Sequence, residues 1–109
     1  LRALVLANNG IAPDPAAFDA VNRAAARVSL RLEAAGTLCV AADGDALDEI
    51  VAVAFRAMLD GSWARLKACR TCGWSFHDYS PNRSATWCSM QLCGNRTKTR
   101  AYRRRRSVR

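Results

Sequence analysis

Residues 69–94 of the chain read CRTCGWSFHDYSPNRSATWCSMQLCG, and the two pairs of cysteines in this stretch decide the fold. The pattern is C-x2-C-x15-C-x4-C, formed by Cys69, Cys72, Cys88 and Cys93. A pair two residues apart forms a tight knuckle whose sulfurs can reach one ion, and a structural zinc takes four such ligands. If a helix begins at Ser89, a natural N-cap, the later two sulfurs can point back at the knuckle. The stretch therefore predicts a four-cysteine site that binds one Zn2+ per chain.

The alternatives to this site are four buried free thiols or a redox pair, which the double-pair spacing disfavours. Four thiolates leave no open position on the metal, so the predicted site is structural rather than catalytic. His77 stands beside Asp78 and is expected to lie on the surface or partly buried, because the cysteine set is already complete. Cys39 falls in a predicted strand and is expected to be a small core residue, with a reactive thiol as the lesser alternative.

The basic charge of the chain is concentrated at one end. Residues 1–62 contain five Arg and eight acidic residues, a balance of −3, whereas residues 63–109 contain twelve Lys or Arg against the single Asp78, a balance of +11. Such a segment is typical of a protein with a polyanionic partner, although a solvated tail has the same composition.

Length and composition limit the class of protein. With 109 residues, half of them hydrophobic, the chain can bury one compact core and a small metal-held appendage. No run of about 18 apolar residues is present, and nothing near Leu1 looks like a signal peptide, so we expect a cytoplasmic protein without a membrane anchor. Five cysteines in such a chain favour metal binding over disulfides. Leu1 already reads as helix, which suggests a fragment of a longer protein.

The residues before the cysteines alternate between helical and strand patterns. We expect a helix from Leu1 to Asn8, a second from about Pro15 to Arg27, a β-hairpin with strands at 28–33 and 37–41, and a long helix from Asp45 to Gly61. In the first strand Val28, Leu30 and Leu32 should face the core, and in the long helix Leu47, Ile50, Val51, Ala54 and Met58 should form the buried side. No Pro- or Gly-rich linker precedes the cysteines, so the two parts are expected to dock directly.

The predicted fold class is therefore α+β, with a small helical domain and β-hairpin at 1–64 followed by a four-cysteine zinc finger at 65–109. The finger is expected to be a treble-clef-like knuckle with a C-terminal helix. Trp74, Phe76, Tyr79 and Trp87 lie between the cysteines, and we expect them to pack over the metal. Base stacking by these rings is the alternative.

The run Trp87-Cys88-Ser89-Met90, followed by Cys93-Gly94-Asn95-Arg96 and then Lys98, Arg100 and Tyr102, closely resembles the CGNR zinc finger. The likeness extends from about Lys67 to the C-terminus and includes Phe76, Asp78 and Ser80. Its first cysteine pair is more closely spaced than in many members. The first domain is similar to the later part of the ABATE domain that usually precedes this finger. The resemblance implies a bacterial transcription regulator, of a kind described as stress-induced, with a DNA-binding finger.

The helix after the last cysteines is predicted to bind nucleic acid. Met90, Cys93, Gly94, Thr97 and Ala101 share one face toward the metal, so the cations point outward. The candidate contacts are Arg96, Lys98, Arg100, Arg103, Arg104, Arg105, Arg106 and Arg109. Arg96 and Arg100 are expected to contact base edges or adjacent phosphates, and the run Arg103 to Arg106 and Arg109 to contact phosphates.

Duplex DNA is the expected partner, bound by a homodimer because one finger has a small footprint. RNA binding with Trp74 or Tyr79 stacking on bases, and docking of the basic tail to an acidic protein, are the alternatives. An enzyme is not expected, because the sequence has no paired carboxylates, no Ser/His arrangement and no open metal site. A small-molecule effector has no supporting motif.

Overall fold

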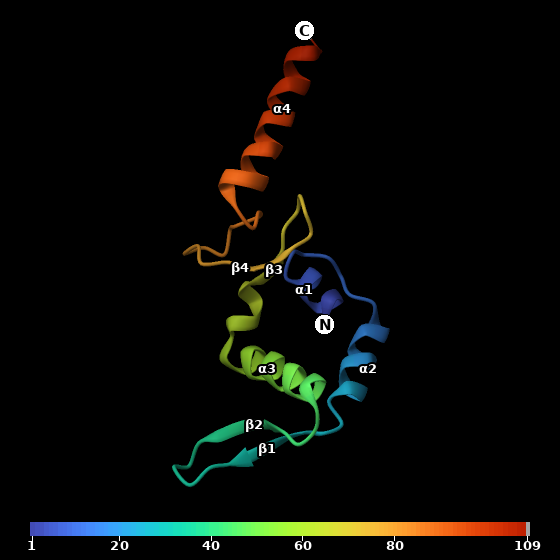
Figure 1. Ribbon diagram of the computed structural model, residues 1–109, viewed down its shortest axis with the longest axis vertical. Coiled ribbons are helices and arrows are strands. Elements are labelled where there is room, and N and C mark those ends of the chain that lie inside the picture. Colours follow the sequence, from blue (N-terminus) through green and yellow to red (C-terminus); the bar gives the residue numbers. More distant parts are fainter. Residues whose placement is uncertain (109) are drawn as a thin grey trace.

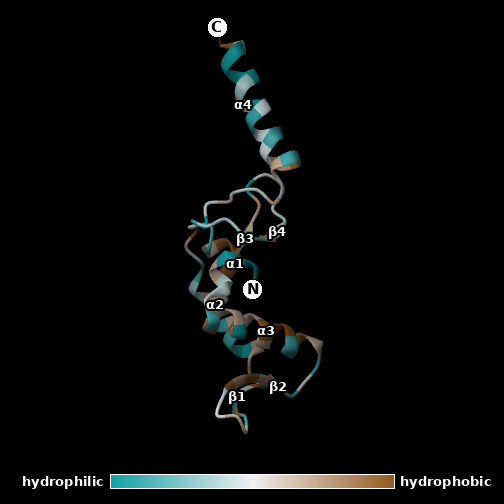
Figure 2. Cartoon of the chain, turned by 90° about the vertical axis from the view of Figure 1, so that its left-hand side faces the viewer, coloured by the Kyte–Doolittle hydropathy of each residue, from teal (hydrophilic) through white to brown (hydrophobic). Residues whose placement is uncertain are grey.

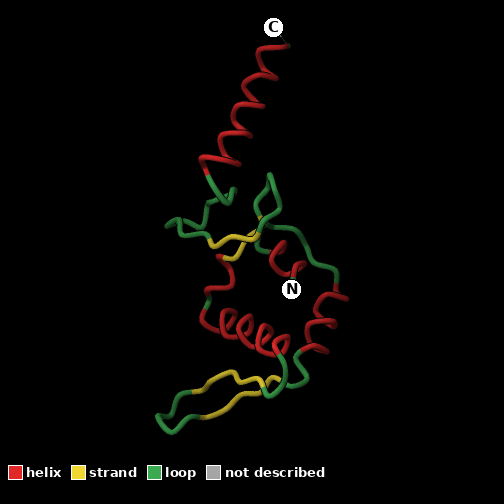
Figure 3. Tube along the Cα trace, in the orientation of Figure 1, coloured by secondary structure: helices red, strands yellow, loops and turns green. Residues whose placement is uncertain are grey.

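The computed structural model describes residues 1–108 of the chain, which form an elongated molecule. Its principal extents are 67 × 31 × 22 Å and its radius of gyration is 18.3 Å, against about 13 Å for a compact chain of this length. Figure 1 shows the reason: the helices and hairpin of the first part lie at one end, a small sheet lies in the middle, and a single helix projects at the other end. The α+β class predicted from the sequence is confirmed, as the mixture of helices and strands in Figure 3 shows.

Two short helices begin the chain. The first, α1, spans Arg2–Ala7, and the second, α2, spans Pro15–Ala24. The Asp14 side chain caps α2 by accepting a hydrogen bond from the Ala16 N–H at 2.9 Å. Pro15 follows at the first helical position, where its missing N–H costs nothing.

The predicted hairpin is present, but its apolar face is only partly covered. Strand β1, Val28–Leu32, pairs antiparallel with β2, Leu38–Ala42. The alternation predicted a buried face, yet Leu30 is 65% and Leu32 is 72% exposed. Val40 in the middle of β2 is buried and its carbonyl accepts from Arg56 of α3, but in Figure 1 the tip of the hairpin extends beyond the end of that helix. The prediction of strands was right, Val28 is half-buried, and the prediction of burial was wrong for Leu30 and Leu32.

Helix α3, Ala46–Asp60, is bounded by the residues that the sequence indicated. Asp45 caps it by accepting from the N–H groups of Leu47 and Asp48, and the Asp48 side chain accepts from the Asp45 N–H in return. Gly61 ends the helix with φ of +83°, a left-handed conformation that favours glycine.

The core of the first part lies where α3 meets α2 and the hairpin. Its buried side chains are Val21, Val40, Val51, Ala52 and Ala54. The predicted inward residues Leu47 and Ile50 are instead 58% and 54% exposed. Periodicity defines the apolar stripe of a helix, but the neighbours that the fold supplies decide which part of the stripe is covered.

The chain continues without a linker into the finger. A 3-10 turn, Ser62–Arg65, leads into β3, Leu66–Ala68, which pairs antiparallel with β4, Ser75–His77. After a loop, a π-helical turn, Met90–Gly94, opens the projecting helix α4, Asn95–Ser107. Figure 2 shows that hydrophilic residues predominate along α4. Within residues 1–108, no helix is long and apolar enough to cross a membrane.

Candidate metal centre and basic helix

The four predicted cysteines converge on one point. The Sγ atoms of Cys69, Cys72, Cys88 and Cys93 all lie within 4.8 Å of one another. Cys69 and Cys93 are buried, Cys88 is half-buried and Cys72 is exposed. His77 is not part of this group and is exposed at the surface.

The spacing of the sulfurs fits zinc. With Zn–S bonds of about 2.3 Å, a tetrahedron places its sulfurs about 3.8 Å apart. The Sγ atoms of Cys72 and Cys88 are 3.7 Å apart, and those of Cys88 and Cys93 are 3.8 Å apart. The four residues are therefore positioned to bind one Zn2+ as a closed structural site.

The surroundings of Cys69 favour the deprotonated form of its sulfur. Burial alone would raise the pKa of Cys69, but backbone hydrogen bonds from Cys72, Cys88 and Thr71 outweigh it and lower this pKa to about 6. Burial and the neighbouring sulfurs raise the pKa of Cys93 to about 12, and that of Cys88 also rises. Without a cation, the pKa values of these thiols therefore differ widely. A bound divalent cation stabilises all four sulfurs in the deprotonated form.

The knuckle owes its shape to the residues around the first pair. The Cys69 N–H donates to the Trp74 carbonyl, and the Gly73 N–H donates back to the Cys69 carbonyl, both at 2.8 Å. Gly73 has φ of +76°, which a residue with a side chain rarely adopts. The turn thereby brings the sulfurs of Cys69 and Cys72 toward the second pair.

The second pair lies at the start of the projecting helix. Ser89 is the N-cap of the π-helical turn that opens α4, and the Ser89 hydroxyl accepts from the Leu92 N–H at 3.3 Å. The first turn is π-helical rather than α-helical, with the Gly94 N–H donating to the Ser89 carbonyl at 3.0 Å. At Gly94 a Cβ would lie 2.7 Å from the Met90 sulfur and 3.3 Å from the Trp87 ring, so any larger residue would require the Met90 side chain to move. The wide turn places Cys93 beside the cluster.

Helix α4 is fixed to the metal centre at its base. The hydroxyls of Thr97 in α4 and Thr71 in the knuckle lie 2.8 Å apart. The Thr97 hydroxyl also donates to the Cys93 carbonyl at 2.9 Å. Of the residues predicted to share the inward face, Cys93 and Gly94 are buried and Thr97 is half-buried, whereas Met90 is 49% exposed.

With this geometry the segment can be compared with known families. The family model of the CGNR zinc finger matches residues 65–106. The segment carries the CGNR zinc finger. The matched finger covers both cysteine pairs and α4 as far as Arg106, which agrees with the resemblance seen in the sequence. A search of curated proteins finds no match to the chain.

The finger presents its cations along α4. All seven Lys and Arg residues of the helix are exposed, and the helix contains no acidic residue. They are the predicted residues Arg96, Lys98, Arg100, Arg103, Arg104, Arg105 and Arg106. Arg106 packs on Tyr102, with its guanidinium carbon 5.7 Å from the ring centre. The remaining predicted residue, Arg109, lies outside the described residues.

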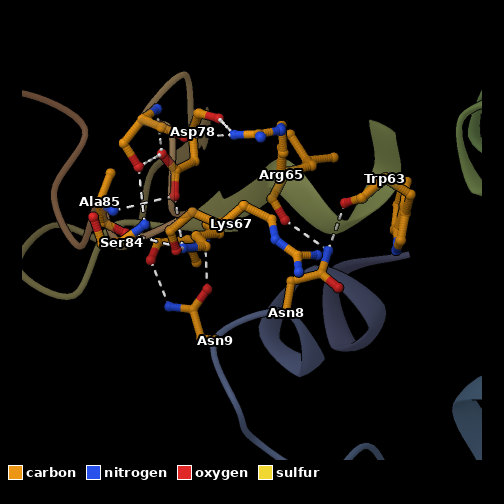
Figure 4. Close-up of polar contacts among 12 residues, drawn as sticks. Asn8, Asn9, Trp63, Arg65, Lys67, Asp78, Ser84 and Ala85 are labelled. Atoms are coloured by element: carbon orange, nitrogen blue, oxygen red, sulfur yellow. Dashed lines mark hydrogen bonds and ion pairs between the residues drawn. The ribbon is translucent and has the colours of Figure 1, made fainter. Parts of the chain in front are cut away.

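Two cations of the finger have an internal role that the sequence did not indicate. Figure 4 shows Lys67 and Arg65 turned toward Asp78 and the loop that follows it. The Lys67 ammonium lies 2.7 Å from the carboxylate of Asp78, which is fully buried. Asp78 also accepts from the N–H groups of Ser80 and Ala85, while Arg65 donates to the Asp78 and Ser80 carbonyls. The Lys67 and Ser80 side chains hold the pKa of Asp78 well below its usual range, against the effect of burial.

Two asparagines connect α1 to the finger, and sequence reasoning gave them no role beyond ending the helix. Asn8 donates to the Trp63 and Leu66 carbonyls at 2.7 and 2.8 Å. Asn9 donates to the Ala68 carbonyl and accepts from the Ala68 N–H, as Figure 4 shows, so its amide pairs like a strand with the edge of β3. The partners are 55 to 59 residues away in the chain, so no local pattern could reveal these bonds.

The aromatic residues of the finger do not all form a core. Phe76 and Trp87 are half-buried, but Trp74 is 73% and Tyr79 is 86% exposed, so the prediction that they pack over the metal was wrong for these two. Hydrogen bonds to Asp78 organise the loop between the two cysteine pairs. The Tyr79 ring rests against His77, with ring centres 4.3 Å apart.

Proposed function

We propose that the chain is a zinc-dependent DNA-binding protein, a bacterial transcription regulator that contacts duplex DNA with α4. The observation behind this proposal is the form of α4: seven exposed cations on a helix without acids, projecting from the body and fixed at its base by the cysteine cluster. Favourable charge at a helix C-terminus accounts for the last cations only. A cationic face along the whole helix suits the phosphates of a nucleic acid.

The dimensions of α4 agree with a major groove. Thirteen helical residues extend about 20 Å, and a helix fits a groove about 12 Å wide. Arg96, Arg100 and Arg103 follow one another at spacings of four and three residues, so they share one side of the helix. We assign Arg96 and Arg100 to base edges or adjacent phosphates, and Arg103 to Arg106 to phosphates.

The interface formed by one finger is small, and a homodimer would add to it by binding a second half-site on the DNA. The first part of the chain offers apolar surface for such an association, since Leu30, Leu32, Ile50 and Val53 are each more than half exposed. Sedimentation of the zinc-loaded protein with and without a selected site measures whether two copies bind together.

The test separates base contacts from phosphate contacts. Preferred sites are first selected from random duplexes, and affinity is then measured over a range of salt. Replacing Arg103 to Arg106 by Gln should weaken binding to all sequences alike and reduce the salt slope by about 0.9 per lost phosphate contact. Arg96→Ala should cost about 1–3 kcal/mol on the preferred site alone. Unchanged affinity in both variants would reject α4 as the interface.

A second candidate is binding to single-stranded RNA. It draws support from the exposed rings of Trp74 and Tyr79, since exposed aromatic rings are the groups on which unpaired bases stack. Tighter binding of RNA than of any selected duplex at equal salt, lost in Trp74→Ala, would favour this function. Failure of both nucleic acids to bind near physiological salt would assign the basic helix to an acidic protein partner.

A further inference from the structure

A polar cavity of about 190 Å³ lies where the end of α1 meets the finger. It is lined by Asn8 and Asn9, by Lys67 and Arg70, and by the segment 83–86. The cavity is separate from α4, none of whose residues line it. In Figure 4 this region lies between Asn9 on one side and Ser84 and Ala85 on the other.

The lining is cationic and contains no acid. Arg70 and Arg83 are exposed, and within residues 1–108 their guanidinium groups form no ion pair or hydrogen bond. The nearest acid of the finger, Asp78, is fully buried and already paired with Lys67. Two guanidinium groups from different segments therefore border the cavity with their donors free.

The walls of the cavity are fixed by hydrogen bonds. The Arg70 N–H donates to the Thr86 carbonyl at 3.1 Å, which joins the two arginine-bearing segments. Arg83 has φ of +52°, an unusual conformation for a residue with a side chain, and its carbonyl accepts from the Lys67 ammonium. Asn9 holds the α1 side of the cavity against β3. The Lys67 and Asp78 pair thus holds Arg83 in place.

We propose that this cavity is a phosphate-binding subsite formed by Arg70 and Arg83, with the hydroxyls of Ser84 and Thr86 as further donors. Arginine recognises phosphate through paired N–H groups, and free donors without acids favour an anion. The volume is below the range of about 300–1,000 Å³ usual for whole small-molecule ligands, so it suits a single anionic group. The phosphate comes either from the DNA backbone, in which case the subsite rests on the proposed function, or from a free phosphorylated molecule.

Nuclear magnetic resonance of the zinc-loaded chain tests the subsite directly. Inorganic phosphate is titrated against chloride at constant ionic strength while amide and arginine side-chain signals are followed. We expect saturable shifts at Arg70 and at residues 83–86. The double variant Arg70→Gln/Arg83→Gln should bind phosphate at least tenfold more weakly, whereas Arg23→Gln, an exposed arginine in α2, should match the wild type.

A duplex titration with the same variants distinguishes the two sources. If the subsite takes a backbone phosphate, the double variant loses affinity for all sequences and its salt slope falls by about 0.9 per lost contact. If it takes a free phosphorylated molecule, duplex affinity is unchanged and only phosphate binding is lost. A separate variant, Lys98→Gln/Arg100→Gln, reports on α4, so failure of the helix interface leaves the shifts at the cavity intact.

The proposal is overturned if phosphate produces no saturable shifts at these residues and the double variant binds duplex like the wild type. It is also overturned if the shifts persist undiminished in the double variant, or if they occur only along α4.

Discussion

At the scale of single residues, the four cysteines account for how so small a module keeps its shape. Their Sγ atoms all lie within 4.8 Å of one another, with two of the distances at the 3.7–3.8 Å of a tetrahedral zinc site, and backbone hydrogen bonds lower the pKa of Cys69 to about 6. A second residue that holds the shape of the finger is Asp78, whose carboxylate accepts hydrogen bonds from Lys67, Ser80 and Ala85. The metal fixes the knuckle to α4, and Asp78 fixes the loop between the cysteine pairs.

The first prediction concerns the metal ligands. Freshly purified wild type should contain one zinc per chain by elemental analysis, and Cys88→Ser should contain little, because three ligands bind zinc far less tightly than four. Cys39→Ser is the matched control, since Cys39 lies in β2 outside the cluster. Equal zinc content in both variants would exclude the four-cysteine site.

The second prediction concerns Asp78. Because its folded pKa lies below its unfolded value of about 4, its ionised form stabilises the fold at all higher pH, and this contribution fades as the pH falls below about 4. Asp78→Asn should be less stable than the wild type, with a constant difference from pH 8 to 5 that narrows in acid. Urea unfolding of both proteins measures the difference between their free energies of unfolding. Release of zinc in acid affects both proteins alike and therefore cancels in this difference. A difference that grows in acid would contradict this assignment.

At the scale of secondary-structure elements, the contact between α1 and β3 connects the first part of the chain to the finger. Asn9 satisfies both the N–H and the carbonyl of Ala68, which is 3% exposed. Buried backbone groups left without partners are costly. A side-chain amide thus takes the place of a neighbouring strand at this edge.

The third prediction follows from that contact. Asn9→Ala should lower the free energy of unfolding by roughly 1–3 kcal/mol, because it leaves two backbone groups of Ala68 unpaired. Asn22→Ala is the control, an exposed asparagine in α2. Urea denaturation followed by Trp fluorescence measures both. Equal stability of the two variants would mean that water replaces the amide without cost.

The elements also show how far sequence reasoning reaches. The hairpin, the Asp45 cap, the Gly61 stop and the cysteine cluster were predicted correctly because each depends on local spacing and backbone chemistry. Burial was predicted less well, as the exposure of Leu30 and Trp74 shows, because it depends on which distant element covers a side chain. The Asn9 bond to Ala68 joins residues 59 apart in the chain and the Lys67 bond to Asp78 joins residues 11 apart, and no local sequence pattern indicated either of them.

At the scale of the whole molecule, the fourth prediction concerns how the parts depend on one another. The core around Val21, Val40 and Val51 does not include the metal centre. Cys88→Ser should therefore unfold the finger and leave α2, the hairpin and α3 folded, while α1 loses its dock on β3. Heteronuclear spectra of the variant show which amides keep their dispersion. Collapse of the entire spectrum would show that the chain unfolds as one cooperative unit.

Within residues 1–108, the elongated shape leaves α4 without packing against the rest of the molecule beyond its base. Helix α4 projects alone, and a helix of thirteen residues without tertiary support is marginal in water, especially one with so many like charges. Its order must come from its base, where Cys93, Gly94 and Thr97 lie against the metal centre. We therefore propose that zinc holds the basic helix in the form that would bind DNA.

The affinity for a selected duplex, measured at fixed salt before and after removal of zinc, tests this claim most directly. We predict that the zinc-free chain binds at least tenfold more weakly, with its preference over random sequence lost, and that added zinc restores both. Removal of zinc does not change the number of Lys and Arg residues, so a purely electrostatic tail would behave differently. Unchanged affinity and unchanged preference in the zinc-free chain would contradict the account.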